Sequence, residues 1–193
     1  TGKMIWKVER ATDAKLESPD AYTSPIPLPG SDPSLFVVSG GDYITAHKSA
    51  DGAEVWRCGG LNPTQGDRWR AVSSPLATRR MAFASVREGP LVACRTGGQG
   101  LVTATHLAWT SPTGPDVPTP VADDKFVYVL DDRAMLSCFE IDTGKPRYEK
   151  QRLPRGTYSA SPLLAAGRLY VTSEDAKTTV LATGPEFKIL SEN

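Results

Sequence analysis

Residues 161–182 read SPLLAAGRLYVTSEDAKTTVLA, and this stretch decides the fold because three short strands and their turns follow one another in it. A small hydroxyl residue and a proline open the stretch and begin a predicted inner strand, 161–165. The run 168–173 alternates side chains between two faces as a pleated strand does, and residues 178–182 lead the chain back. After a Gly-Pro break, residues 187–190 complete a predicted sheet of four antiparallel strands.

The opening pair of this stretch recurs along the chain and marks an internal repeat. A small hydroxyl residue followed by proline and an apolar run occurs at Ser24, Ser74, Thr119 and Ser161. The spacings between these anchors are 50, 45 and 42 residues. A unit of about 40 to 50 residues with four short strands is the size of one β-propeller blade.

A second anchor is a glycine followed four positions later by an aromatic residue. It occurs as Gly2 and Trp6, Gly52 and Trp56, and Gly144 and Tyr148, while a degenerate copy ends at Trp109. Because blades pack face to face, each needs one large apolar side chain at the interface, and a tryptophan can bury on the order of 200 Å² there. Proline is tolerated as the first residue of a strand. We therefore expect the three tryptophans of this anchor to occupy similar surroundings.

The two anchors predict an all-β chain, a β-propeller segment of four four-stranded antiparallel blades. The expected units are an outer strand of a preceding blade at 1–10 and blades at 22–58, 72–110, 117–150 and 158–193. The 17 glycines and 16 prolines break the chain into short segments, as in all-β proteins rich in turns. A two-layer sandwich is the competing architecture, but its strands are not expected to repeat in sequence.

The overall charge excludes several classes of partner. Lys+Arg and Asp+Glu both number 22, so the formal net charge is zero and we expect neither nucleic-acid nor membrane-surface binding. The apolar stretches are too short to span a bilayer, so we predict that the chain is not transmembrane. The opening from Thr1 to Trp6 reads as the middle of a strand-turn-strand unit, which suggests a fragment or a processed product.

The thiol and imidazole groups give no catalytic site that we can assemble. Cys58, Cys94 and Cys138 contain no Cys-x-x-Cys pair, and we interpret them as small buried hydrophobes. His47 is expected at a strand end and His106 within a strand. Neither histidine has a nearby nucleophile in sequence, and two histidines without clustered acids make a poor zinc site.

The acidic pairs and the glycine-rich segment also have structural interpretations. Asp123-Asp124 and Asp131-Asp132 adjoin strand ends, so we interpret them as turns rather than calcium ligands. The glycine-rich run 96–100 joins strands and lacks the strand-to-helix context that a phosphate loop needs. The sequence therefore predicts no catalytic, cofactor-binding or metal-binding residue.

Several stretches together resemble the pyrroloquinoline-quinone-like (PQQ-like) β-propeller repeat. They are residues 1–6, 51–56, 142–145, 161–171 and 184–190, and the resemblance covers nearly the whole chain. The ending resembles the last blade of exported bacterial members, which implies a periplasmic, secreted or cell-surface location. Whole propellers of this kind commonly have seven or eight blades. The resemblance thus implies part of a longer propeller chain or one half of a homodimeric ring.

We expect a non-enzymatic scaffold or interaction module that binds a protein or carbohydrate partner. Propellers bind at segments that depart from the repeat, and the largest departure is the connector 58–72. There Trp69 lies between Arg68 and Arg70, and these three residues form a candidate contact for such a partner. The alternative is that Trp69 fills the interface between blades. The Pro-rich stretch 111–120 is a second connector of this kind.

The alternative function is a fragment of a PQQ-dependent quinoprotein dehydrogenase. Dehydrogenases of this resemblance have two adjacent cysteines beside the quinone and a calcium ion held by acidic and amide oxygens. No two cysteines are adjacent in this sequence. We therefore predict no cofactor and favour the non-enzymatic function.

Overall fold

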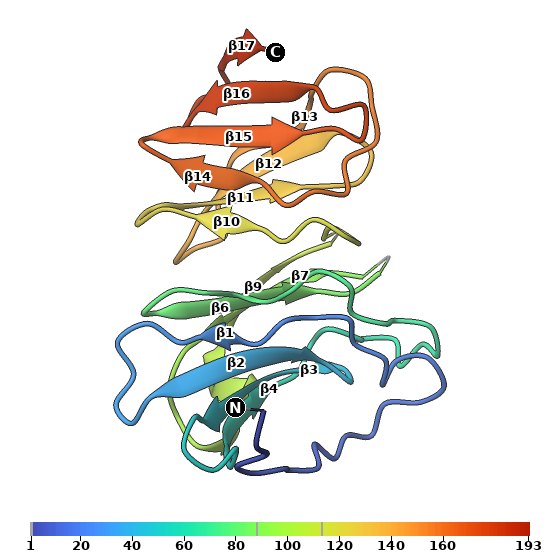
Figure 1. Cartoon of the computed structure of the whole chain (residues 1–193), viewed down its shortest axis with the longest axis vertical. Coiled ribbons are helices and arrows are strands. Elements are labelled where there is room, and N and C mark those ends of the chain that lie inside the picture. The colour runs from blue at the N-terminus through green and yellow to red at the C-terminus, as the bar shows by residue number, and fades with distance from the viewer. Residues whose placement is uncertain (1, 88, 113) are drawn as a thin grey trace.

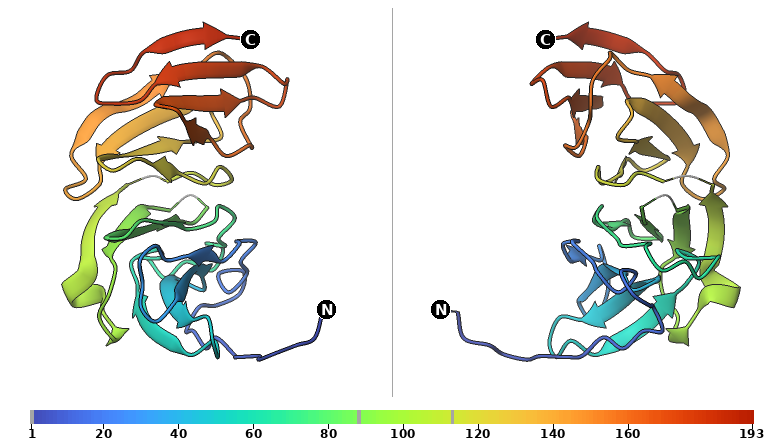
Figure 2. Two further views of the ribbon diagram at one scale, coloured as in Figure 1. Left: turned by 60° about the vertical axis from the view of Figure 1, so that its left-hand side comes forward. Right: turned by 90° about the vertical axis from the view of Figure 1, so that its right-hand side faces the viewer.

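Four β-sheets stack side by side in the computed structural model, which describes residues 2–87, 89–112 and 114–193. Figure 1 shows the sheets one above another in chain order, and Figure 2 shows that they form an arc open on one side. Each sheet is one blade, so the predicted all-β propeller segment of four blades is confirmed. Among the described residues, no helix is long and apolar enough to cross a membrane.

Consecutive strands of each blade pair in antiparallel fashion, in the order that the repeat predicts. Blade 1 contains β1 (Ile26–Pro27), β2 (Leu35–Gly40), β3 (Tyr43–Lys48) and β4 (Glu54–Cys58). Blade 2 contains β5 (Leu76–Ala77), β6 (Met81–Ser85), β7 (Leu91–Arg95) and β9 (Leu107–Ser111). Blade 3 contains β10 (Val121–Ala122), β11 (Phe126–Leu130), β12 (Met135–Glu140) and β13 (Pro146–Arg152). Blade 4 contains β14 (Leu163–Ala165), β15 (Arg168–Thr172), β16 (Thr178–Ala182) and β17 (Ile189–Glu192).

A short fifth strand extends blade 1 at its outer edge. This strand, β8 (Gly100–Leu101), comes from the segment between β7 and β9 and pairs in parallel with β4. The helix α1 (Thr103–His106) follows it directly and leads into β9. Blade 2 thus contributes a strand to blade 1, which the repeat pattern does not predict.

Every blade has a β-bulge at the same place, between its third strand and its outer strand. The bulge determines which outer-strand side chain points at the next blade. The residue pairs beside the bulge are Ala46–Trp56, Ala93–Trp109, Cys138–Tyr148 and Val180–Ser191. Three of the four blades therefore hold an aromatic side chain at one structural position, and blade 4 holds a serine there.

The hydrophobic core consists of three clusters, and each cluster lies between two adjacent blades. We call them the 1–2, 2–3 and 3–4 interfaces. In β11, Val127 and Val129 belong to the 2–3 interface, whereas Tyr128 and Leu130 belong to the 3–4 interface. Both faces of this blade are buried, which explains its continuous apolar run. Burial of one large apolar side chain contributes about 1.5–3 kcal/mol, so these interfaces dominate the stability of the arc.

Trp109 shows how the second anchor works at the 2–3 interface. Its Nε1–H donates to the carbonyl oxygen of Ile141 at 2.8 Å. Its indole lies on the tight turn between β12 and β13, where a Cβ added at Gly144 would come within 2.5 Å of the ring. The glycine of one repeat therefore leaves room for the tryptophan of the preceding repeat.

Trp6 docks on blade 1 in the same way. Its Nε1–H donates to the carbonyl oxygen of Ser49 at 3.2 Å, and a Cβ added at Gly52 would come within 2.7 Å of the ring. The ring also stacks on Phe36, with 6.1 Å between the ring centres. Trp6 thus occupies the position that an outer-strand aromatic of a preceding blade would occupy.

Trp56 is fully buried in the 1–2 interface but lacks the matching hydrogen bond. Its Nε1 has no hydrogen-bond partner among the described residues. The chain after β7 forms the glycine-rich loop 96–99 and then enters β8, so blade 2 has no tight turn at this place. Each of the three tryptophans packs on a neighbouring blade, but their surroundings differ: Trp56 is fully buried and lacks the hydrogen bond, Trp109 is half-buried, and Trp6 is 39% exposed.

The hydroxyl of the first anchor joins consecutive blades. The backbone N–H groups of Ser24, Ser74 and Thr119 donate to the hydroxyls of Ser74, Thr119 and Ser161, at 2.9, 3.0 and 2.9 Å. The hydroxyls of the second, third and fourth anchors therefore each accept the N–H of the preceding anchor. We call this row the anchor ladder, and it explains why the residue before each proline has a small hydroxyl side chain.

Three local predictions need correction. His106 lies in α1 and not in a strand, because the insertion after β8 turns the chain before β9. The outer strand of blade 4 is Ile189–Glu192 rather than 187–190, since the bulge shifts the pairing toward the C-terminus. Residues 2–14 form no strand and pair with none of the described strands. Thr1, part of the predicted strand 1–10, lies outside the described residues.

Candidate functional site

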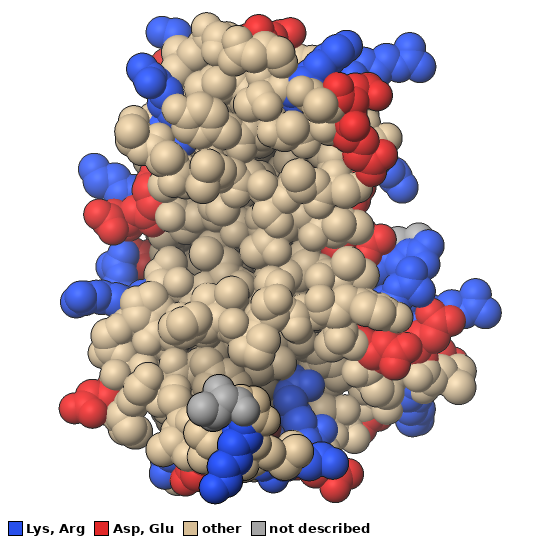
Figure 3. Space-filling view, viewed as in Figure 1, with Lys and Arg blue, Asp and Glu red and all other residues tan. Residues whose placement is uncertain are grey.

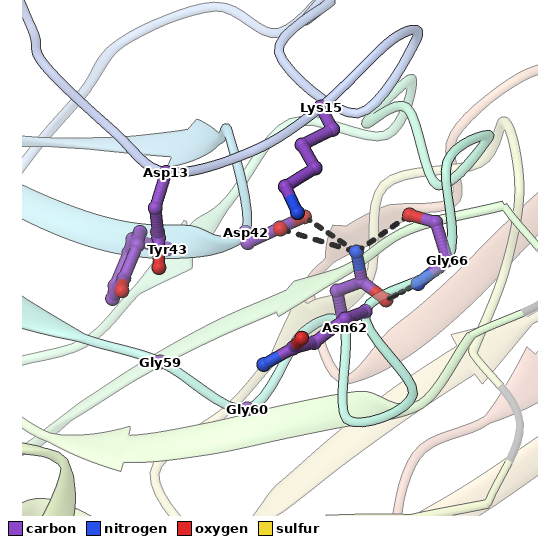
Figure 4. A pocket seen from close by; sticks show the side chains of 9 residues that line it. Asp13, Lys15, Asp42, Tyr43, Gly59, Gly60, Asn62 and Gly66 are labelled. Atoms are coloured by element: carbon purple, nitrogen blue, oxygen red, sulfur yellow. Dashed lines mark hydrogen bonds between the residues drawn. The ribbon is translucent and has the colours of Figure 1, made fainter.

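The connector between β4 and β5, residues 59–75, helps to form a polar pocket at one end of blade 1 (Figure 4). The turn between β2 and β3 and the N-terminal segment complete its wall, and its volume is about 310 Å³. The lining residues are Asp13, Lys15, Asp42, Tyr43, Gly59, Gly60, Asn62, Gln65 and Gly66. We call it the mouth pocket because loops form its walls except at Tyr43, the first residue of β3.

Asn62 holds the connector against the β2–β3 turn. Its Nδ2 group donates to both carboxylate oxygens of Asp42 at 3.1 Å and to the carbonyl oxygen of Gly66 at 2.9 Å. Its Oδ1 accepts the N–H of Gly66 at 2.8 Å. One side-chain amide therefore closes the connector turn and orients a carboxylate in the pocket wall.

Both the backbone conformation and the partial burial of the Asp42 carboxylate are energetically unfavourable. Its φ angle is 70°, in the left-handed region that aspartate tolerates better than most residues. Burial raises the pKa of Asp42, the hydrogen bond from Asn62 acts against this shift, and the nearby Asp13 carboxylate adds to it. Figure 4 shows the amino group of Lys15 directed toward Asp42. A carboxylate that is partly desolvated and fixed in direction is suited to binding a polar or cationic group.

Tyr43 forms one side of the pocket and is supported by Arg57. The guanidinium of Arg57 lies 5.1 Å from the centre of the Tyr43 ring and pairs with Glu54. Burial raises the pKa of the Tyr43 hydroxyl, and a hydrogen bond with Asp13 adds to the shift. Tyr43 is therefore a neutral phenol at physiological pH. The pocket offers carboxylates, amides and a phenol, groups that recognise a ligand by hydrogen bonds and charge.

The predicted partner-binding residues lie on the same connector, beside the mouth pocket and not in its lining. Trp69 is half-buried against the 1–2 interface, and its backbone N–H donates to Ser18 Oγ at 3.2 Å. Arg70 pairs with Glu17 at 3.4 Å, so it is held by the N-terminal segment. Arg68 is exposed at the surface. The structure thus brings the connector to a pocket, but through residues other than these three.

Asp42 and Asn62 are absent from the prediction because they meet only in the folded chain. The two residues are 20 positions apart, on a turn within blade 1 and on the connector that leaves it. A partial signal is present, because Asn-Pro followed by glycine at 62–66 is typical of a turn closed by the asparagine side chain. That signal predicts the turn and not the carboxylate that the turn orients.

The acidic pairs act as turn residues, as predicted. Asp123 and Asp131 each accept two backbone N–H groups of the turn that follows them. Asp132 accepts the backbone N–H groups of Asp116 and Val117 from the connector 111–120. Within the residues that the structure describes, no group of three or more His, Cys, Asp and Glu side chains is arranged to hold a metal ion.

The cysteines and His47 are part of the core. Cys58 and Cys94 belong to the 1–2 interface and Cys138 to the 3–4 interface, all as free thiols. Burial raises the pKa of the Cys138 thiol to about 12, so it stays protonated. His47 stacks on Phe36 at 5.4 Å, and both of its ring nitrogens have hydrogen-bond partners in blade 1. The interpretation of the cysteines as buried hydrophobes is confirmed.

Comparison with known proteins places this architecture among propellers. The family model described as outer membrane protein assembly factor BamB matches residues 96–184. BamB from Moraxella catarrhalis superposes with a TM-score of 0.65 and 20% identity, and the match covers 100% of this chain and 55% of that chain. This chain therefore spans about half the length of that BamB. The comparison with curated protein sequences gives no match.

Two computationally designed proteins have similar folds. Ika4 superposes with a TM-score of 0.64 and 11% identity, over 95% of this chain and 100% of that chain. Ika8 superposes with a TM-score of 0.61 and 9% identity, over 93% of this chain and 50% of that chain. At these identities the likeness concerns the fold alone. Residues 96–184 match that family model, and the anchors of the repeat recur along the chain, which together support the PQQ-like β-propeller repeat that the sequence resembles.

Proposed function

We propose that this chain is a non-enzymatic propeller scaffold that binds a protein partner at the mouth pocket. The observation that carries the proposal is the Asp42 carboxylate, which Asn62 fixes in the pocket wall. The connector that builds this wall, 59–75, is longer than its counterparts 112–120 and 153–162. Part of this connector packs in the 1–2 interface through Leu61, Ala71 and Trp69, and the additional chain also forms a polar pocket, which supports a binding role.

The chemistry of the pocket favours a basic side chain of the partner. Asp13 and Asp42 contribute two carboxylates and Lys15 one ammonium group, so the lining has an excess of negative charge. A lysine or arginine presented by a partner loop would complement that charge. Arg68, exposed on the same connector, lies close enough in sequence to contact an acidic residue of the same partner.

The family description names an assembly factor, and protein partners are what such a factor needs. We extend this to the chain as a proposal, together with the periplasmic or cell-surface location that exported members imply. The proposal covers the connector residues Arg68, Trp69 and Arg70 as the rim of the same contact. Trp69 and Arg70 would then support the rim, since both are held against the N-terminal segment.

Selection of displayed random peptides on the folded chain tests this function. We expect enrichment of peptides with lysine or arginine, and at least tenfold weaker binding to Asp42→Asn, which keeps the side-chain shape and removes the charge. Asp51→Asn is the matched control, because Asp51 is an exposed turn aspartate of the same blade outside the pocket. Selected peptides that bind Asp42→Asn as tightly as the natural chain would contradict the proposal.

The same variants distinguish the other partners. Sugar hydroxyls also bind carboxylates and amides, so a glycan array is the second arm of the test. A glycan that binds the natural chain and not Asp42→Asn, without any peptide selection, would replace the protein partner by a carbohydrate. Calorimetric titration with PQQ and calcium tests the dehydrogenase alternative, for which stoichiometric binding would be the supporting result.

A further inference from the structure

The outer face of blade 4 has the side chains of a blade interface. Strand register places Leu163, Tyr170 and Val180 in one row across β14, β15 and β16. The equivalent row of blade 3 is Val121, Tyr128 and Cys138, and it packs in the 3–4 interface. The equivalent row of blade 2 is Leu76, Phe83 and Ala93, and it packs in the 2–3 interface. Blade 4 therefore repeats a row that is covered in the blades before it.

This face is partly open to solvent in the structure. Leu163 is 62% exposed and Tyr170 is half-buried, whereas Val180 is 7% exposed. Figure 2 shows that blade 4 and blade 1 are the two ends of the arc and that the chain termini lie at its open side. In Figure 3, which views the open side, uncharged residues cover the middle from blade 4 to blade 1, and charged residues gather along the margins.

The anchor ladder shows that the two ends of the arc, blade 1 and blade 4, are complementary. Within the described residues it runs from Ser24 in front of blade 1 to Ser161 in front of blade 4. The next donor of the ladder would be the backbone N–H of Ser161, and the next acceptor would be the hydroxyl of Ser24. One end of the arc thus supplies the donor that the other end needs, so a blade 1 fits on the outer face of a blade 4.

We propose that a second copy of this chain docks on the outer face of blade 4 and that two copies related by a twofold axis close an eight-bladed ring. In each of the two new interfaces, the N–H of Ser161 in one copy donates to the hydroxyl of Ser24 in the other. Leu163 and Tyr170 of one copy cover Phe36 of the other. This inference is independent of the ligand proposed for the mouth pocket. It uses continuity with the three blade interfaces already present.

Trp6 and Ser191 add a second point of fit. Ser191 stands where the other blades carry an aromatic residue, and Trp6 already lies in the position of such an aromatic in front of blade 1. In the ring, Trp6 of one copy supplies the aromatic that blade 4 of the other lacks. Residues 2–10 then run along the outer edge of that blade. For the ring to close, part of the short terminal strand β17 must therefore move away from this edge.

Light scattering after size-exclusion chromatography, across a range of micromolar concentrations, gives the first test. We expect about twice the mass of the 20.7 kDa chain for the natural sequence and the monomer mass for Tyr170→Glu. Leu101→Glu is the matched control, because Leu101 is 69% exposed at the edge of blade 1, and it should leave the dimer intact. Circular dichroism of each variant verifies that it is folded. A natural chain that stays monomeric, or that forms open polymers, overturns the proposal.

Cross-linking tests the arrangement of the two copies. The double variant Ser24→Cys with Ser161→Cys should form a disulfide-linked dimer, whereas each single variant should stay monomeric on a non-reducing gel. The native cysteines do not compete, because all three are buried. Trp6→Ala should weaken dimerisation at least tenfold. A double variant that gives no disulfide-linked dimer, or a natural dimer that is unaffected by Trp6→Ala, indicates another interface and overturns the ring.

Discussion

The 1–2 and 2–3 interfaces use the same structural position to join two blades, yet they hold their tryptophan differently. Trp109 lies on the tight turn of blade 3, and its N–H bonds to the carbonyl oxygen of Ile141. Trp56 is completely buried, but the glycine-rich loop and β8 replace the turn that would accept its N–H. The comparison indicates that both interfaces depend on burial of an apolar ring. The hydrogen bond from the indole N–H forms only where the next blade has a regular tight turn.

The largest effect is expected where burial is complete. Trp56→Ala should lower the free energy of unfolding by about 3–5 kcal/mol, because it leaves a large cavity in the 1–2 interface. Trp6→Ala should cost only about 1 kcal/mol in the monomer, because Trp6 is 39% exposed and loses less buried area. Urea unfolding followed by circular dichroism measures both changes. Equal losses would show that the depth of burial does not rank the interfaces.

The turn glycine of the 2–3 interface comes next. Gly144→Ala should cost about 2–4 kcal/mol, since it combines left-handed backbone strain at φ 69° with overpacking against Trp109. Gly167→Ala is the matched control, because Gly167 has φ 70° and no atom within 4 Å of an added Cβ. The control should lose only the backbone part, about 1–2 kcal/mol. Thermal unfolding midpoints that fall equally would exclude contact with the indole as the reason for the glycine.

Replacing each tryptophan by phenylalanine isolates the hydrogen bond. Both Trp56→Phe and Trp109→Phe remove part of an indole, but only Trp109→Phe breaks a bond to a backbone carbonyl. We expect Trp109→Phe to lose about 1 kcal/mol more than the loss from ring size alone. Trp56→Phe avoids that extra loss, because it removes an N–H that has no partner among the described residues. Chemical denaturation of the two variants under one condition measures the difference.

The sequence predicts the interfaces well because their chemistry recurs. A hydroxyl residue followed by proline repeats with the blade and has the same role at each of the three blade junctions. The aromatic residue of the second anchor also recurs and packs on the next blade, although its hydrogen bond varies. Strand alternation then places the apolar rows on both faces. These features depend on residues close together in sequence or separated by one repeat.

The parts that escape prediction arise where the repeat is interrupted. Nothing in residues 96–106 shows that Gly100 and Leu101 pair with the preceding blade, because the partner strand lies more than 40 positions upstream. The meeting of Asp42 with Asn62 likewise depends on how the connector folds across blade 1. The sequence marks this connector as the largest departure from the repeat, but not the carboxylate that the pocket presents.

A further difference between the blades concerns His47 of blade 1. By strand register His47 occupies the position that Cys94 has in blade 2 and Phe139 has in blade 3. It is 5% exposed, and burial lowers its pKa, although the hydrogen bond to the carbonyl oxygen of Gly52 acts in the opposite direction. The folded chain therefore holds His47 as the neutral imidazole.

This lowered pKa makes the stability of blade 1 depend on pH. In the unfolded chain His47 has a pKa of about 6.5, so below this pH the unfolded chain binds a proton at His47 and the folded chain does not. The free energy of unfolding therefore falls as the solution is acidified. The slope for one such group cannot exceed about 1.4 kcal/mol per pH unit. His47→Phe, which copies Phe139 of blade 3, should reduce the drop in unfolding midpoint between pH 7.5 and 5.5. An equal drop in the natural chain and the variant would assign the pH dependence to other groups, because the substitution removes the only buried imidazole among the described residues.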